Sequence, residues 1–260
     1  MSLFALALVL GAAVLHATWN LLAKRAVADV PFLWLAYLVG AVVFAPFAVA
    51  ILLIARPALG WPALAFVALA SCLQILYFAT LGAIAILGER PTPLAIAGAL
   101  AIVAGALVLT GDPRALAASG AGRAVGFALA TGVVIAAYTL WDKTAVSALL
   151  IPPLFYDWAT VTGQSLLFAP LALRRREELR ETWTRRRGAV IGVGILSRLA
   201  YILVLTALVV SPVSYVAPAR EIGILFGAFL GVRVLAEGHV TRRGIGAAAM
   251  VLGVIALAVS

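Results

Sequence analysis

Several ionisable side chains lie inside long apolar runs of this sequence, and Arg198 is the clearest of them. It is the eleventh residue of the run 188–210, which places it near mid-depth if that run crosses a bilayer. Because a guanidinium in hydrocarbon costs several kcal/mol, such residues face a polar interior or a partner. Two interpretations stay open: Arg198 binds a carboxylate or phosphate of a substrate, or it forms a structural ion pair with Glu221 or Asp157. Tyr201 lies one helical turn further on and shares its face.

A second group of candidates interrupts the apolar run 214–236. Pro218 frees a backbone carbonyl inside the run, as bent and cavity-lining segments do. Arg220 and Glu221 follow directly, and Glu221 is a candidate for coupling to protons. The alternative is that both charges simply mark a helix start at the membrane interface.

A polar and aromatic stripe at helical spacing marks the first apolar run, with His16, Trp19 and Asn20. We expect it to line a substrate site, although His16 would also fit a buried structural histidine. The tryptophans would fit an interfacial belt. An equivalent stripe recurs in the second half, formed by Tyr138, Trp141 and Asp142. Two weaker candidates, Gln74 and Tyr77, lie between the two stripes.

The composition indicates a membrane protein. Of 260 residues, 65% are hydrophobic and 11% are charged, whereas soluble domains carry about a quarter charged residues. The formal charge of +9 does not indicate nucleic-acid binding, because most Lys and Arg residues lie between apolar runs, where the positive-inside rule expects them. We find no protease, esterase or phosphate-binding motif, and the single cysteine gives no metal site, so we expect no enzyme activity and no cofactor.

Proline and glycine positions divide the chain into nine apolar runs, each long enough for a span of roughly 20 residues. We read the first run as a retained span, because it lacks the basic start of a signal peptide. The fold class predicted is therefore an all-α polytopic membrane protein. The runs are 3–23, 32–55, 61–88, 93–110, 122–141, 152–173, 188–210, 214–236 and 241–259.

Matches between the two halves indicate an internal repeat. Trp19-Asn20 matches Trp141-Asp142, and Leu87-Gly88-Glu89 matches Leu235-Ala236-Glu237 further along. The first half is shorter by about 22 residues between the matched positions, roughly one transmembrane helix. We therefore predict a first repeat at 1–111, a linker at 112–120 and a second repeat at 121–260. The halves have four and five helices here, against five and five in the parent inverted-repeat plan.

Two further segments bear on the surroundings of the bundle. The stretch 174–187 holds seven arginines and three glutamates, and we expect a solvated cytoplasmic loop that touches anionic lipid. Gly223, Gly227 and Gly231 form a ladder that permits close helix packing, within the bundle or in a homodimer.

Several of these motifs resemble the EamA-type members of the drug/metabolite transporter superfamily. The resemblance rests on Leu15-His16-Ala17-Thr18-Trp19-Asn20-Leu21-Leu22-Ala23-Lys24, on Leu87-Gly88-Glu89-Arg90 and on the glycine-rich last helix of each half. It implies a ten-helix inner-membrane protein with two inverted repeats and a central cavity lined by helices one, three and four of each half. It also implies transport of amino acids, metabolites or drugs, often outward.

The resulting hypothesis is an inner-membrane secondary transporter of small polar metabolites, amino-acid-like compounds or drugs. Its expected partners are a small-molecule substrate, the lipid bilayer and protons as coupling ion. The alternative is a non-transporting or degenerate membrane protein of the same family, which the short first repeat would explain.

Overall fold

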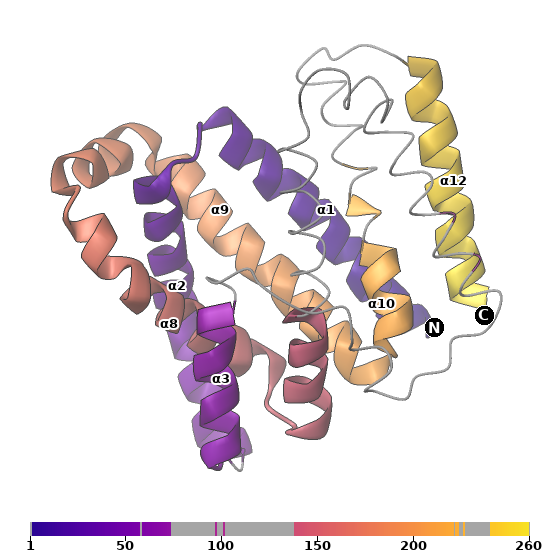
Figure 1. Ribbon diagram of the computed structural model, residues 1–260, viewed down its shortest axis with the longest axis horizontal. Helices are drawn as coiled ribbons and strands as arrows, with labels where there is room; N and C mark the ends of the chain where they lie inside the picture. Colours follow the sequence, from indigo (N-terminus) through magenta and orange to yellow (C-terminus); the bar gives the residue numbers. More distant parts are fainter. Residues whose placement is uncertain are drawn as a thin grey trace.

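The computed structural model describes residues 2–57, 59–73, 138–220 and 240–259, with the single positions 97, 101, 222, 223 and 226. Every element in these ranges is helical (Figure 1). Residues 138–143 continue into the π-helical turn η1 (Thr144–Ala148). The other elements are α1 (Leu3–Arg25), α2 (Val30–Ala55), α3 (Trp61–Leu73), α8 (Pro153–Leu173), α9 (Arg176–Val210), α10 (Val213–Arg220) and α12 (Val240–Val259).

The predicted runs 3–23, 32–55, 152–173 and 241–259 are confirmed as helices to within two residues at each end. Among the described residues, three helices are both long and apolar enough to cross a membrane, namely α1, α2 and α9. The runs 93–110 and 122–141, and the segment where the first repeat is short, lie largely or wholly outside the described residues. The repeat boundaries therefore remain a prediction.

Helix α9 is the central element of the bundle, with α1 and α2 packed along it (Figure 1). Small residues allow a close approach between α2 and α9. A methyl group added to Gly194 would lie 2.6 Å from the Ala36 carbonyl oxygen and 3.0 Å from Val39 Cβ. Such separations are below contact distance, so the two backbones meet here only because Gly194 has no side chain.

The basic stretch 174–187 differs from the predicted loop. Its residues are mostly exposed, but α9 already begins at Arg176, and Arg186 alone departs from helical geometry (φ −125°, ψ 15°). Paired charges at helical spacing explain the difference, because Arg185 Nη1 lies 3.3 Å from Oε1 of Glu181, one helical turn earlier. Leu179 and Thr182 are buried, so this first part of α9 has an inner face as well as a solvated one.

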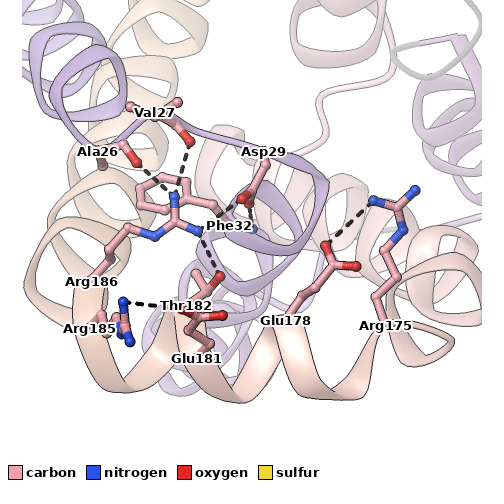
Figure 2. A network of polar contacts seen from close by, with 10 residues as sticks. All are labelled: Ala26, Val27, Asp29, Phe32, Arg175, Glu178, Glu181, Thr182, Arg185 and Arg186. Atoms are coloured by element: carbon pink, nitrogen blue, oxygen red, sulfur yellow. Dashed lines mark hydrogen bonds and ion pairs between the residues drawn. The ribbon is translucent and has the colours of Figure 1, made fainter.

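Arg186 at this kink fastens α9 to the turn between α1 and α2 (Figure 2). Its Nη1 donates hydrogen bonds to the carbonyl oxygens of Ala26 (2.7 Å) and Val27 (3.0 Å). Its Nη2 donates to Asp29 Oδ2 and Thr182 Oγ1, both at 2.9 Å. One guanidinium therefore satisfies carbonyls left open at the end of α1 and joins them to α9. We call this set of contacts the Arg186 clamp.

Asp29 has a double role in the Arg186 clamp, because its other carboxylate oxygen caps α2 by accepting from the Phe32 backbone N–H at 2.9 Å. Partial burial alone would raise the pKa of Asp29, but the Arg186 guanidinium and the Phe32 N–H outweigh it and lower this pKa. The clamp is thus built around an ionised carboxylate.

We predict that Gly194→Ala lowers the free energy of unfolding by about 1–3 kcal/mol, because the added methyl group meets backbone on α2. The matched control is Gly188→Ala in the same helix, where an added methyl group meets nothing within 4 Å. That control should raise stability by up to about 1 kcal/mol through helix propensity. Denaturant titration of the detergent-solubilised protein measures both, and equal effects would contradict the close crossing.

We predict that Arg186→Ala lowers the free energy of unfolding by about 1–3 kcal/mol, because four acceptors lose their shared donor. The control Arg185→Ala removes an exposed ion pair and should change stability by about 0.5 kcal/mol or less.

The effect of Arg186→Ala should also depend on pH. Because the pKa of Asp29 is lowered in the folded protein, its stabilisation is present above the unfolded-state pKa and is lost as pH falls through the folded-state pKa. The difference between wild type and Arg186→Ala should therefore shrink in acid. A difference that stays constant through that range would show that Asp29 is not part of the clamp.

Candidate functional site

The candidate site is centred on an ion pair between helices α9 and α8. Arg198 Nη1 lies 3.1 Å from Asp157 Oδ1 and donates a hydrogen bond to it. The Asp157 side chain is 1% exposed and that of Arg198 is 13% exposed. The ion pair that the sequence analysis gave as one interpretation of Arg198 is thus formed with Asp157. The Arg198 side chain is thus the more accessible of the two.

Aromatic rings and one glycine set the position of Arg198. Its guanidinium carbon lies 5.8 Å from the ring centre of Tyr37 and 5.9 Å from that of Tyr201, within cation–π range. A methyl group on Gly40 of α2 would lie 2.7 Å from Arg198 Cγ, so the bare backbone of Gly40 leaves room for the arginine stem. The stem is therefore held between α2 and α9 while the head reaches α8.

A second buried carboxylate, Asp142, lies beside this ion pair. It accepts hydrogen bonds from the hydroxyl of Tyr156 at 2.8 Å and from that of Tyr201. Tyr201 therefore contacts Asp142 directly through its hydroxyl, and contacts Arg198, the partner of Asp157, through its ring. The ring of Tyr138 lies 6.3 Å from that of Tyr201 and extends the aromatic wall.

Lys143 fastens the Asp142 segment to the far end of α9. Its Nζ donates to the Leu208 carbonyl oxygen (2.7 Å) and the Ser211 carbonyl oxygen (3.0 Å), which close the last turn of α9. A cation at a helix C-terminus also suits the helix dipole. The residue next to Asp142 is thus a structural cation that joins this segment to α9.

His16 on α1 and Arg220 at the end of α10 complete the group of charges. His16 lies within electrostatic range of both Arg198 and Arg220, and Asp142 lies within range of Arg220 and Asp157. In the described part of the chain no hydrogen-bond partner is found for His16 Nδ1. The five charged or titratable residues of this group, which we call the polar cluster, are His16, Asp142, Asp157, Arg198 and Arg220.

Three of the predicted site residues lie apart from these contacts. Trp141 stacks on Phe66 with ring centres 3.9 Å apart and donates to its carbonyl oxygen at 3.1 Å, so it joins the segment to α3. Asn20 is exposed and donates to the His16 carbonyl oxygen in its own helix. Pro218 lies half-buried within α10.

Trp19 packs edge-on against His16 with ring centres 5.3 Å apart. Its buried Nε1 has no hydrogen-bond partner among the described residues. Gln74, Tyr77 and Glu221 lie outside the described residues, and Gly227 and Gly231 do so too.

Sequence reasoning did not select Asp157 and Tyr156 as site residues. A signal for Asp157 was present, because it is the only acidic residue in the apolar run 152–173. Tyr156 and Tyr37 carried none, since tyrosines recur throughout membrane proteins. Among the described residues, no three His, Cys, Asp or Glu side chains come together in a way that would hold a metal ion.

The polar cluster contains two guanidinium groups and two carboxyl groups within a bundle whose buried residues are mostly apolar. Such an arrangement can bind a charged ligand by exchanging one internal partner for an external one. Buried polar residues facing the interior of a helical bundle are typical of proteins that carry polar solutes across membranes. The fold and the site together are typical of one class of protein, the helical membrane transporters.

Comparisons with known proteins identify the family. The profile of the EamA-like transporter family matches residues 122–259, more than half of the chain, so the chain belongs to that family. It is an all-α, multi-pass membrane protein and a transporter of the drug/metabolite transporter superfamily, whose EamA members are transporters rather than enzymes.

A solved crystal structure is similar to the whole chain, with a TM-score of 0.65, and the match covers 98% of this chain and 97% of the other. At 19% sequence identity, that likeness shows the fold alone. No curated protein matches the sequence.

We predict that Arg198→Met lowers the free energy of unfolding by about 3–5 kcal/mol, because it removes the only ion-pair partner of the buried Asp157 carboxyl group among the described residues. The double variant Arg198→Met/Asp157→Leu should recover most of that loss, since an apolar pair of similar volume needs no counter-ion. Denaturant titration of the four members of this cycle gives the coupling energy.

The exposed pair Arg185–Glu181 serves as control, and its own cycle should give a coupling of about 0.5 kcal/mol or less. A coupling between Arg198 and Asp157 as small as that of the control would mean that the two charges do not depend on each other.

Proposed function

We propose that this chain is a secondary carrier of the cell inner (cytoplasmic) membrane for small polar metabolites that bear a carboxylate, amino-acid-like compounds among them. The observation that carries the proposal is Arg198, a largely buried arginine that no membrane helix would keep without a compensating role. The family supplies the transport activity, and the cluster supplies the chemistry of the cargo.

The contacts of Arg198 favour a planar anionic group as its ligand. Nη1 is taken by Asp157, whereas Nε has no hydrogen-bond partner in the described part of the chain. A guanidinium presents its donors in a fixed fork that matches the two oxygens of a carboxylate. The rings of Tyr37 and Tyr201 border the fork and favour a small cargo with an apolar part.

Other polar atoms of the site fit such a cargo. Trp19 Nε1 and His16 Nδ1 lie on α1 and are available, as far as the described residues show, for hydrogen bonds to a ligand. Arg220 adds a second positive group within electrostatic range of His16. The inner-membrane location rests on the resemblance of the sequence to its family, together with the basic segment 174–187, which the positive-inside rule places on the cytoplasmic face.

We predict that the purified chain in proteoliposomes takes up at least one of three labelled probes, L-alanine, L-lactate and L-aspartate, faster than empty liposomes do. Arg198→Gln in the Asp157→Asn background should lower that rate at least about tenfold, because a charge-assisted carboxylate contact is lost while no charge stays unpaired. Initial rates of uptake measure the effect.

Arg187→Ala provides the matched control, since it removes an exposed arginine of the same helix and should leave uptake unchanged. Equal uptake by wild type, the double variant and Arg187→Ala would exclude Arg198 from the transport site. The absence of uptake of every probe by a correctly folded wild-type chain would favour the non-transporting alternative.

A further inference from the structure

The ion pair between Arg198 and Asp157 is asymmetric. A single contact joins Nη1 to Oδ1, and no hydrogen-bond partner for Asp157 Oδ2 or Arg198 Nε is found among the described residues. The Asp157 side chain is 1% exposed, so its carboxylate depends on this one guanidinium, whereas the Arg198 side chain is 13% exposed and is the more accessible of the two. A ligand thus meets Arg198 before it meets Asp157.

The other groups that face Asp157 do not replace Arg198. Asp142, in the segment before η1, is a like charge within electrostatic range, and the hydroxyls of Tyr156 and Tyr201 are directed to Asp142 rather than to Asp157. Helix α2 contributes Tyr37, which faces the guanidinium. Helix α3, over Trp61–Leu73, contains no acidic or basic residue and has Cys72 as its only titratable side chain.

The charges of the polar cluster sum to zero in the empty site. His16 on α1 lies within electrostatic range of Arg220 on α10, and Arg220 lies within range of Asp142. With both carboxyl groups ionised and the histidine neutral, the cluster contains two positive and two negative charges. A monoanion added to it would leave one uncompensated negative charge in a site shielded from water.

We propose that a carboxylate ligand displaces Asp157 from Arg198 and that Asp157 takes up one proton in the same step, so that a monoanion and a proton cross the membrane together. This inference rests on the proposed carrier function and adds the coupling ion and the residue that binds it. Glu221, the proton site considered from the sequence, lies outside the described residues.

The charge balance of the step is complete. The proton comes from water on the side where the ligand enters, and an O–H bond forms at Asp157 as its contact with Nη1 is given up. Arg198 stays protonated and now pairs with the ligand carboxylate. The cluster has the same net charge empty and loaded, so both forms meet the same electrostatic barrier when the bundle rearranges. Release of the ligand reverses each step.

The test measures proton uptake on ligand binding by the purified full chain in detergent, in weakly buffered solution at neutral pH with an indicator dye. Acetate is the probe, its binding is followed by equilibrium dialysis, and uncharged acetamide of the same shape is the control ligand. We expect about one proton per chain bound with acetate and none with acetamide.

Two variants assign the proton. Asp157→Asn should still bind acetate, because Arg198 is then free, but should take up no proton. The double variant Asp157→Asn/Arg198→Gln should lose acetate binding and remain folded, since its two amides form a neutral pair. An infrared carboxylic-acid band that appears with acetate in wild type should be absent from Asp157→Asn.

Any of four results would overturn the proposal: wild type that does not bind acetate, binding without proton uptake, uptake that persists in Asp157→Asn, or equal uptake with acetamide. The assay requires no transport, which separates it from the carrier function. Proton-linked binding without flux in proteoliposomes would refute the carrier function alone, whereas flux without proton uptake would refute the coupling alone.

Discussion

The site depends on one physical constraint: a guanidinium within an apolar helical bundle must be compensated by protein. Arg198 satisfies this through Asp157 on the neighbouring helix α8. The attraction alone does not make such a pair stabilising, because desolvation of both groups opposes it. Its presence in a transporter therefore argues for a role in handling charge, and several nearby polar atoms have no hydrogen-bond partner among the described residues.

The packing of α2 against α9 makes this ion pair possible. Gly40 gives the stem of Arg198 its space, and Gly194, one turn earlier in α9, lets the two backbones approach. With larger residues at these positions the helices would stand further apart, and the guanidinium would not be wedged between Tyr37 and Tyr201. Small residues at helix crossings are the usual means of close packing in membranes. In this protein the small residues Gly40 and Gly194 also help to position the Arg198 guanidinium.

Much of the described fold was predictable, because hydrophobic length and proline punctuation are strong signals in a membrane sequence. The runs that became α1, α2, α8 and α12 show this. The charged segment before the kink was misjudged as a loop. Its charge density obscured the helical spacing of Glu181 and Arg185 and the two buried residues that give it an inner face.

The site was predictable in part. A charged residue within an apolar run, such as Arg198, is recognisable from the sequence as a candidate site residue. Its ion-pair partner depends on which helices are neighbours, and a single sequence does not contain that information. Asp157 and Glu221 were therefore equivalent choices until α8 was seen against α9. Trp141 shows the same limit: its match to Trp19 in the repeat suggested a shared role, and its stacking on Phe66 depends on a neighbour that the sequence does not reveal.

The Arg186 clamp has a mechanical consequence. The Arg186 side chain, at the bend of α9, binds the carbonyl oxygens of Ala26 and Val27 just after α1 and the Asp29 carboxylate that caps α2, so these three helices are joined at that end. Pivoting of α9 about this joint would displace its distant end most, where Lys143 holds the final turn. The contact of Lys143 opposes such a movement, so α9 is held on both sides of Arg198, by Arg186 at the bend and by Lys143 at the last turn.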